Sequence, residues 1–183
     1  MRCYLLMSLL AWIACGCAPG IHDLAGRGDV VQLECRLARD PGLVNARGRL
    51  GKTPLHYAVT YGSDAAIEVL LAHGADINAQ DDTGLTPLHV AVMLNRRRAA
   101  RFLLDHQADL HTTDHFGDTP LHTAALFGQA DMAACLLEAG AASDARNREG
   151  LTPLDLAQRE RKAGVAALLQ SSPGINAGPR SGS

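Results

Sequence analysis

Histidine and cysteine are the residues of this sequence best suited to chemistry, because imidazole and thiolate groups bind metals and act as bases or nucleophiles. The chain of 183 residues holds eight histidines and five cysteines. Three of the histidines, His56, His89 and His122, each end a tetrapeptide TPLH and recur every 33 residues. If each tetrapeptide opens a helix of a regular stack, neighbouring helix axes lie about 8–10 Å apart. That separation is too large for adjacent histidines to share one zinc ion through bonds of about 2 Å.

A second group of histidines lies near two carboxylates. His106, His111 and His115 are interspersed with Asp109 and Asp114. Both residue types bind transition metals, but this spacing matches none of the standard zinc patterns. The sequence also offers no Gly-rich phosphate loop, nucleophile elbow or pair of catalytic carboxylates. We therefore expect no bound metal, no cofactor and no enzymatic activity; the alternative is a metal held by these three histidines.

The composition indicates a helical globular protein rather than a nucleic-acid-binding one. Hydrophobic residues make up 47% of the chain and aromatic residues only 4%, which is too apolar for disorder and poor in residues that favour strands. The formal net charge is −2, whereas proteins that bind nucleic acid usually carry a basic patch or stripe. A nucleic-acid partner is therefore not supported.

A repeat of 33 residues organises most of the chain. TPLH and its variant TPLD occur in one register, and an alanine follows two positions after each copy. The four copies begin at Thr53, Thr86, Thr119 and Thr152. Four in-register copies at a fixed period indicate a protein built from stacked units.

This pattern resembles that of the ankyrin repeat family. The segments HGADINA, HQADLHT and AGAASDA close three repeats, and a polar turn containing Gly follows each. The resemblance implies an all-α solenoid of helix-turn-helix units with β-hairpin-like fingers, and about five repeats including degenerate caps. The expected domain spans 18–172, with repeats at about 19–52, 53–85, 86–118, 119–151 and 152–172, between a signal peptide at 1–17 and a disordered tail at 173–183.

The physical chemistry of the repeat supports this fold. Threonine before proline is a good helix start, because the hydroxyl caps exposed N–H groups and proline gives up no needed donor. The leucines of the tetrapeptides are expected on the buried face, at Leu55, Leu88, Leu121 and Leu154. The resemblance further implies that the motif histidines hydrogen-bond the backbone and tie neighbouring repeats together.

Repeat three is expected to be the least stable locally. Gln107 replaces the glycine that ends the second helix elsewhere, at Gly74 and Gly140. A side chain in that left-handed conformation destabilises the fold by about 1 kcal/mol. Asn95 replaces the glycine between the two helices but tolerates positive φ better.

The first 17 residues have the features of an export signal. Arg2 precedes an apolar run from Tyr4 to Ala14, and small residues follow, an order typical of a secretory signal peptide. The run is shorter than the roughly 20 residues that span a bilayer. The segment ending at Cys17 resembles the lipobox of bacterial lipoproteins, with Cys15 as a second candidate. This resemblance implies lipidation and a periplasmic protein anchored to the outer membrane; the alternative is an apolar segment that caps the first repeat.

The remaining cysteines are not expected to form a disulfide. Cys3 lies in the signal, whereas Cys35 and Cys135 occupy equivalent second helices three repeats apart. At about 10 Å per repeat, their Cα atoms cannot approach the roughly 5.5 Å that a disulfide needs. We expect both to be small buried hydrophobic residues.

Partners of ankyrin proteins contact the fingertips and the exposed side of the first helices, and the resemblance transfers these positions by register. The fingers are 49–52, 81–85, 114–118 and 147–151. On the first helices, the corresponding positions predict an apolar ladder of Tyr61, Leu94 and Phe127 along the concave face; the alternative is that these side chains pack against the fingers. The predicted partner-binding residues are Tyr61, Leu85, Met93, Leu94, His115, Phe116, Leu126 and Phe127.

Four arginines form a basic cluster at the start of the second helix of repeat three. They are Arg96, Arg97, Arg98 and Arg101. Cations at a helix N-terminus oppose the helix dipole, so local stability does not explain them. Two alternatives remain: an acidic partner or anionic lipid headgroups bind there, or the arginines form a solvated face.

These observations predict a monomeric protein-binding module, an adaptor or inhibitor in the bacterial cell envelope. Two alternatives remain open. One is a secreted effector that binds host proteins, and the other is an immunity protein that neutralises a toxin. The sequence does not identify the partner.

Overall fold

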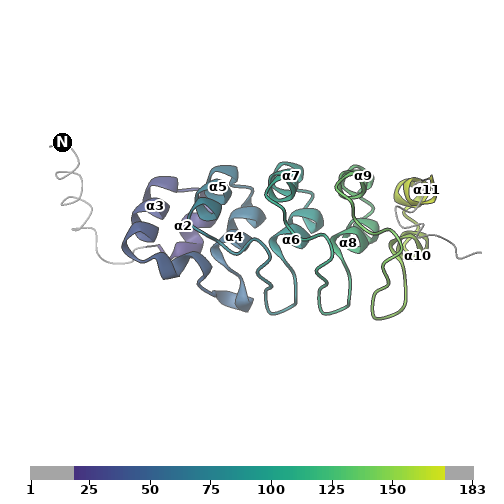
Figure 1. Ribbon diagram of the computed structural model, residues 1–183, viewed down its shortest axis with the longest axis horizontal. Helices are drawn as coiled ribbons and strands as arrows, with labels where there is room; N and C mark the ends of the chain where they lie inside the picture. Colours follow the sequence, from purple (N-terminus) through teal and green to yellow (C-terminus); the bar gives the residue numbers. More distant parts are fainter. Residues whose placement is uncertain (1–18, 172–183) are drawn as a thin grey trace, which may run out of the picture.

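The computed structural model describes residues 19–171, in which ten α-helices form five helix-turn-helix pairs. The pairs stack side by side in two rows, and the loops between pairs project from one edge as fingers (Figure 1). The inner row consists of α2 (Ile21–Arg27), α4 (Pro54–Tyr61), α6 (Pro87–Met93), α8 (Pro120–Phe127) and α10 (Pro153–Arg159). The outer row consists of α3 (Val30–Arg39), α5 (Asp64–Ala72), α7 (Arg97–Asp105), α9 (Ala130–Glu138) and α11 (Ala163–Ser171).

Two short 3₁₀ helices, η1 (Pro41–Asn45) and η2 (Arg49–Gly51), follow the first pair, and no β-strand occurs between residues 19 and 171. The all-α prediction is therefore confirmed, with fingers that are hairpin-like in path only. The proposed signal peptide at 1–17 and tail at 173–183 lie outside the described residues. Within the described part of the chain, no helix is long and apolar enough to cross a membrane.

The inner helices begin where the TP dipeptides predict. Thr53, Thr86, Thr119 and Thr152 occupy the N-cap positions, and a proline is the first residue of each following helix. At the fourth position, His56, His89, His122 and Asp155 complete capping boxes with these threonines. The helix start is thus encoded within four residues: the threonine, the proline and the fourth residue each satisfy or remove a backbone donor that the helix leaves unpaired.

The turns within each pair need a residue in the left-handed conformation. Gly62 and Gly128 supply it after α4 and α8, and Asn95 adopts it after α6 with φ of 53°. At the end of α7, Gln107 keeps the left-handed conformation of its glycine counterparts with φ of 63°. A side chain at positive φ destabilises this region, which supports the expectation for repeat three.

The core runs along the stack between the two rows. Leu55, Leu88 and Leu121 of the inner helices have no exposed surface. Leu154 is only half-buried, contrary to expectation. The reason is that α10 packs against α8 and α11 and no further inner helix covers it among the described residues.

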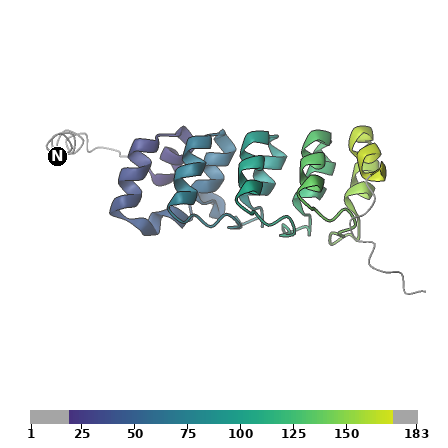
Figure 2. The same ribbon diagram turned by 45° about the horizontal axis from the view of Figure 1, so that its top comes forward.

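Contacts between neighbouring outer helices are uneven. The pair α3–α5 packs most closely, followed by α9–α11 and then α5–α7, and α7 and α9 make fewer close contacts than any of these. Figure 2 shows the five pairs side by side with the outer row brought toward the viewer. Between α6 and α8, by contrast, the inner row is continuous.

Candidate functional site

The buried histidines of the tetrapeptides fix the position of each inner helix relative to the next finger. His89 accepts the N–H of Thr86 at Nδ1 (3.3 Å), and its Nε2 donates to the carbonyl oxygen of Asp118 (3.0 Å) in the following finger. His56 makes the same pair of contacts with Thr53 and Leu85. Because Nδ1 accepts and Nε2 donates, these contacts require the neutral imidazole.

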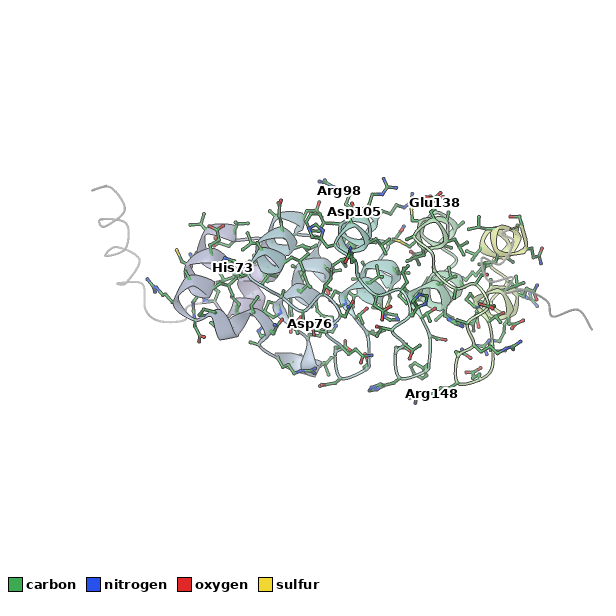
Figure 3. All side chains as sticks on the ribbon, viewed as in Figure 1. His73, Asp76, Arg98, Asp105, Glu138 and Arg148 are labelled. Atoms are coloured by element: carbon green, nitrogen blue, oxygen red, sulfur yellow. The ribbon has the colours of Figure 1, made fainter. Side chains whose placement is uncertain are left out.

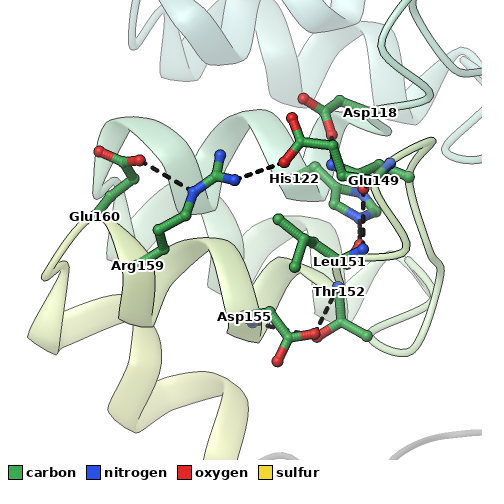
Figure 4. A network of polar contacts seen from close by, with 9 residues as sticks. Asp118, His122, Glu149, Leu151, Thr152, Asp155, Arg159 and Glu160 are labelled. Carbon is green, nitrogen blue, oxygen red and sulfur yellow. Dashed lines mark hydrogen bonds and ion pairs between the residues drawn. The ribbon is translucent and has the colours of Figure 1, made fainter.

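The same arrangement recurs at the C-terminal end of the array (Figure 4). His122 Nε2 donates to Leu151 O (3.1 Å). In the last repeat, Asp155 replaces histidine and accepts from the N–H (2.8 Å) and hydroxyl (2.7 Å) of Thr152. These cap bonds hold the pKa of Asp155 below its ordinary value. Aspartate fulfils the capping function of the motif, and no later finger follows it within the described residues.

Burial lowers the pKa of all three motif histidines. His56, His89 and His122 have no exposed surface, and desolvation penalises the charged imidazolium more than the backbone acceptors and nearby carboxylates favour it. Neutral, buried and fully hydrogen-bonded, these side chains act as structural links that position the inner helices.

The inner helices present a row of exposed apolar side chains at their C-terminal ends. Tyr61 is 65% exposed, Leu94 40% and Phe127 47%. We refer to these three residues as the ladder. Met93 and Leu126, one position earlier in their helices, are half-buried beside it. An exposed apolar side chain therefore stands at the same register position in three successive repeats.

The first rung of the ladder rests against the first repeat. A Cβ atom on Gly26 would lie 2.8 Å from Cδ2 of Tyr61, so a larger residue there would require this exposed ring to shift. Tyr61 and Gly26 line a small open pocket of about 260 Å³ together with His22, Arg27 and other residues. The first repeat thus closes the N-terminal end of the ladder.

The fingertips form a separate surface. Phe116 is 69% exposed at a fingertip, and α8, eight residues long or about 12 Å, separates it from Phe127 at the other end of that helix. Leu85 packs half-buried against the core. The exposed His115 donates its backbone N–H to Thr83 O (3.1 Å) and thereby joins two fingers. The structure therefore does not bring the three predicted finger residues onto the ladder.

Comparison with known proteins agrees with this architecture. A model of ankyrin repeats in three copies matches residues 21–114, and a model of ankyrin repeats in many copies matches residues 103–157. The chain belongs to the ankyrin repeat family. Domains of this family are typically non-catalytic modules that bind other proteins. No curated protein matches the chain.

Within this ankyrin array, the clustered arginines make contacts with neighbouring repeats. Arg97 pairs with Asp131 (2.6 Å) on the following repeat, and Arg98 pairs with Asp64 (3.0 Å) on the preceding one. Arg96 reaches the inner row, where it donates to Thr60 O (3.0 Å). Much of the predicted anionic-partner patch therefore links neighbouring ankyrin repeats, although all four arginines stay exposed.

An open groove of about 540 Å³ separates α7 and α9 on the outer side of the ankyrin array. Its basic wall includes Arg97, Arg98 and Arg101 on α7, and its acidic residues are Asp105, Asp131 and Glu138. Arg98, Asp105 and Glu138 are seen along the outer edge in Figure 3. The lining holds three cations and three carboxylates, so the groove has no net charge to attract a partner of either sign.

The second histidine group is integrated into the ankyrin loops. His106 stacks on Phe102 with ring centroids 4.3 Å apart. Asp109 accepts from the His111 N–H (2.8 Å) and the Thr112 hydroxyl (2.7 Å), and these bonds lower its pKa. Between residues 19 and 171, no three His, Cys, Asp or Glu side chains are grouped closely enough to hold a metal ion.

The expectation that both repeat cysteines are buried was wrong. Cys35 is exposed and Cys135 is half-buried, and both are free thiols. Cys35 lies on α3, which has an outer neighbour, α5, on one side only among the described helices. Cys135 lines the groove between α7 and α9, where the neighbouring helix stands away from it.

Sequence reasoning missed one exposed apolar residue of the fingers. Leu50 is 57% exposed and has φ of 59°. It lies two periods before Phe116, so the repeat register held the signal. The predicted finger 49–52 contains it, but only Leu85, His115 and Phe116 were chosen as partner-binding residues of the fingers.

Proposed function

We propose that this ankyrin array is an adaptor or inhibitor of the bacterial cell envelope that holds a periplasmic protein against the ladder of Tyr61, Leu94 and Phe127. Exposure of these side chains is the observation that carries the proposal. Three exposed apolar residues aligned over three repeats are an unusual surface for a protein without a partner. Aromatic and leucine side chains in such a strip supply large contact areas on binding.

The proposed location rests on the sequence of the N-terminal segment. Arg2, the apolar run and Cys17 favour export and lipidation, which tethers the array to the periplasmic side of the outer membrane. A single acyl chain binds membranes only weakly, so stable anchoring needs at least two membrane-binding signals. The described helices then work as a tethered binding surface.

The test is crosslinking of intact cells that express the full-length protein, followed by mass spectrometry of the captured proteins. The test variant carries Tyr61→Ala, Leu94→Ala and Phe127→Ala. We expect a partner that the wild type captures and this variant loses, because the variant truncates all three side chains of the ladder. Circular dichroism establishes that the variant is folded.

A matched control carries Val31→Ala and Leu50→Ala. Val31 is 72% exposed and Leu50 57% exposed, and both are outside the ladder. The control is expected to capture the partner normally. Equal capture by the ladder variant and the wild type contradicts the proposed binding surface. Loss of envelope localisation in Cys17→Ala, with Cys15→Ala as comparison, tests the anchor.

A further inference from the structure

We infer that Arg96 and Gln129 are positioning residues of the ladder. Each holds the ladder residue of the preceding repeat in place by donating a hydrogen bond to the carbonyl oxygen just before it. This role rests on the proposed function, because it names the residues that fix two positions of the same binding surface. It also accounts for Arg96, whose charge at the start of α7 opposes the dipole of its own helix.

The end of α4 leaves one carbonyl oxygen without a backbone donor. The Gly62 N–H bonds Val59 O (3.1 Å), and the next N–H along the chain bonds Ala58 O (2.9 Å). Thr60 O receives no backbone N–H within the described residues. A helix leaves its last carbonyl groups unpaired in this way, and they carry a partial negative charge. A donor from outside the helix is therefore needed at Thr60.

Arg96 supplies that donor from the following repeat. Its guanidinium donates to Thr60 O (3.0 Å) and also lies 3.7 Å from the position of a Cβ on Gly62. Thr60 and Gly62 flank Tyr61 in the sequence, so the guanidinium contacts the chain on both sides of this ladder residue. A cation at a helix C-terminus stabilises the helix dipole. The charge that is unfavourable for α7 is therefore favourable for α4.

Gln129 makes the equivalent contact one repeat later. Its side-chain amide donates to Met93 O (3.3 Å), and Met93 directly precedes Leu94. This donor and acceptor are 36 residues apart, the same separation as between Arg96 and Thr60. Because the side chain of Gln129 is neutral, the feature that the two repeats share is the hydrogen bond and not the charge.

The third ladder residue, Phe127, offers an internal comparison. Lys162 occupies the equivalent register position in the next repeat, and its Cδ lies 2.7 Å from the position of a Cβ on Gly128. Within residues 19–171, however, Lys162 makes no hydrogen bond to Leu126 O, in contrast to the equivalent side chains of the two preceding repeats. Phe127 therefore has a cation nearby, but its helix end is not bonded to the following repeat.

Tyr61 is held by the repeats on both sides of its own. Its ring meets Gly26 of the first repeat, where an added Cβ would lie 2.8 Å from Cδ2. Its backbone is fixed from repeat three by the bond between Arg96 and Thr60 O. Without that bond, the last turn of α4 is expected to open more often and the ring to leave Gly26. Because a surface that is already ordered loses less entropy on binding, Arg96 should strengthen binding without touching the partner.

The experiment measures amide hydrogen exchange by NMR on the purified full-length protein. Arg96→Ala removes the donor, and we expect exchange at Tyr61 and Gly62 to accelerate about fivefold, because one hydrogen bond of typical strength is lost. The nuclear Overhauser effect between the Tyr61 ring and the Gly26 α-protons should weaken in the same variant. A residue that served overall stability alone would change exchange throughout the array and leave this ring contact unaltered.

The chain itself offers the matched controls. Arg96→Gln introduces the side chain that Gln129 uses one repeat later and is expected to keep both signals at their wild-type values. Gln129→Ala should accelerate exchange at Leu94, as Arg96→Ala does at Tyr61. Lys162→Ala removes a cation at the same register position without removing a hydrogen bond, so exchange at the end of α8 should accelerate less. Unchanged exchange in Arg96→Ala or in Gln129→Ala, no rescue by Arg96→Gln, or equal acceleration in Lys162→Ala overturns the inference.

Crosslinking of intact cells separates this role from the proposed function. If Arg96→Ala captures less partner than the wild type and Arg96→Gln captures it normally, both stand. If the ladder variant loses the partner and Arg96→Ala keeps it, the role of Arg96 in binding is wrong and the binding surface is retained. If the partner survives loss of the ladder, the proposed function itself is wrong, and the exchange measurements alone decide whether Arg96 fixes Tyr61.

Discussion

The first repeat and the three TPLH repeats solve the same structural problem with different residues. In repeat three, the single side chain of His89 accepts from the Thr86 N–H and donates to the next finger. In the first repeat, Asp23 accepts from the Gly20 N–H (3.3 Å), while His22 Nε2 contacts Ala46 O (2.9 Å). Each repeat needs a capped inner helix and a hydrogen-bond donor for a carbonyl in the segment that follows. The TPLH motif is one set of residues that supplies both.

The two solutions differ in burial. The motif histidines have no exposed surface, whereas His22 is half-buried and packs edge-on against Tyr57 with ring centroids 5.1 Å apart. A buried side chain stabilises the fold when all of its hydrogen bonds are made, and the loss of one of them costs more free energy than the loss of an exposed hydrogen bond. The central repeats should therefore depend on their histidines more than the first repeat depends on either of its two residues.

The largest expected effect is acid destabilisation of the central repeats. The pKa values of His56, His89 and His122 are lowered in the folded state, so the unfolded chain binds more protons as pH falls below about 6.5. Stability should be constant above about pH 7 and decrease below 6.5, by at most about 4 kcal/mol per pH unit for three groups. Urea unfolding between pH 7.5 and 5 measures this slope.

The variant His89→Asn sharpens that prediction, because asparagine offers an acceptor to the cap but does not titrate. It is expected to reduce the slope by about a third. Asp109 and Asp155 also have lowered pKa values, but their contribution is lost only as pH falls below about 3.8. An unchanged stability from pH 7 to 5 contradicts the structural role of the neutral histidines.

The second prediction compares single substitutions in the two regions. His89→Ala leaves the Thr86 N–H and the Asp118 carbonyl without their partner and opens a cavity, so we expect a loss of about 3 kcal/mol. His22→Ala removes one half-buried link and should lower stability by about 1 kcal/mol. Chemical denaturation of the two variants gives both values. Equal losses would remove the distinction between the regions.

A third prediction concerns the divided roles in the first repeat. Asp23→Ala removes the side chain that caps Gly20 and should destabilise the protein by about 1 kcal/mol. Because Asp23 and His22 act separately, the double variant should lose the sum of the two single losses. A double-mutant cycle measures this, and a coupling energy well above experimental error would show that the two residues form one unit.

The smallest expected effect lies within the central repeats. Gln107 is held at φ of 63°, and its counterpart Gly74 has nothing within 4 Å of an added Cβ. The strain is therefore in the backbone and not in a clash. Gln107→Gly should relieve it at some entropic cost, for a net gain of about 0.5 kcal/mol. Hydrogen exchange in α7 should slow, and a loss of stability would show that the strain is compensated elsewhere.

The fold was predictable because the same helix-starting motif occurs four times at a fixed period. Thr, Pro, Leu and His or Asp each fulfil a physical function at a fixed place in the first turn of a helix, and the fixed period places these helices in one register. The first repeat obscures this logic, since its capping residue and its linking histidine stand side by side in the sequence. Asp23 therefore went unrecognised as a cap.

The candidate site was predictable where it depends on register and not where it depends on neighbours. The exposure of Tyr61, Leu94 and Phe127 follows from their place in the repeat. The distance between Phe116 and the ladder, the pairing of Arg97 with Asp131 and the exposure of Cys35 depend on which repeat lies alongside and how closely. A single sequence does not encode the local separation of α7 from α9 in any motif.

That separation gives the molecule a preferred direction of bending. At the junction of repeats three and four, Gln129 holds Met93 O (3.3 Å) and His89 holds Asp118 O (3.0 Å) on the inner side, while α7 and α9 stand apart on the outer side. On the outer side, the Arg97–Asp131 ion pair (2.6 Å) and the Arg101–Cys135 contact (3.8 Å) span the groove, so this edge is held by exposed polar contacts rather than by close packing. Bending at this groove would change the distance between Leu94 and Phe127. A protein bound across both residues would therefore respond to tension applied along the array.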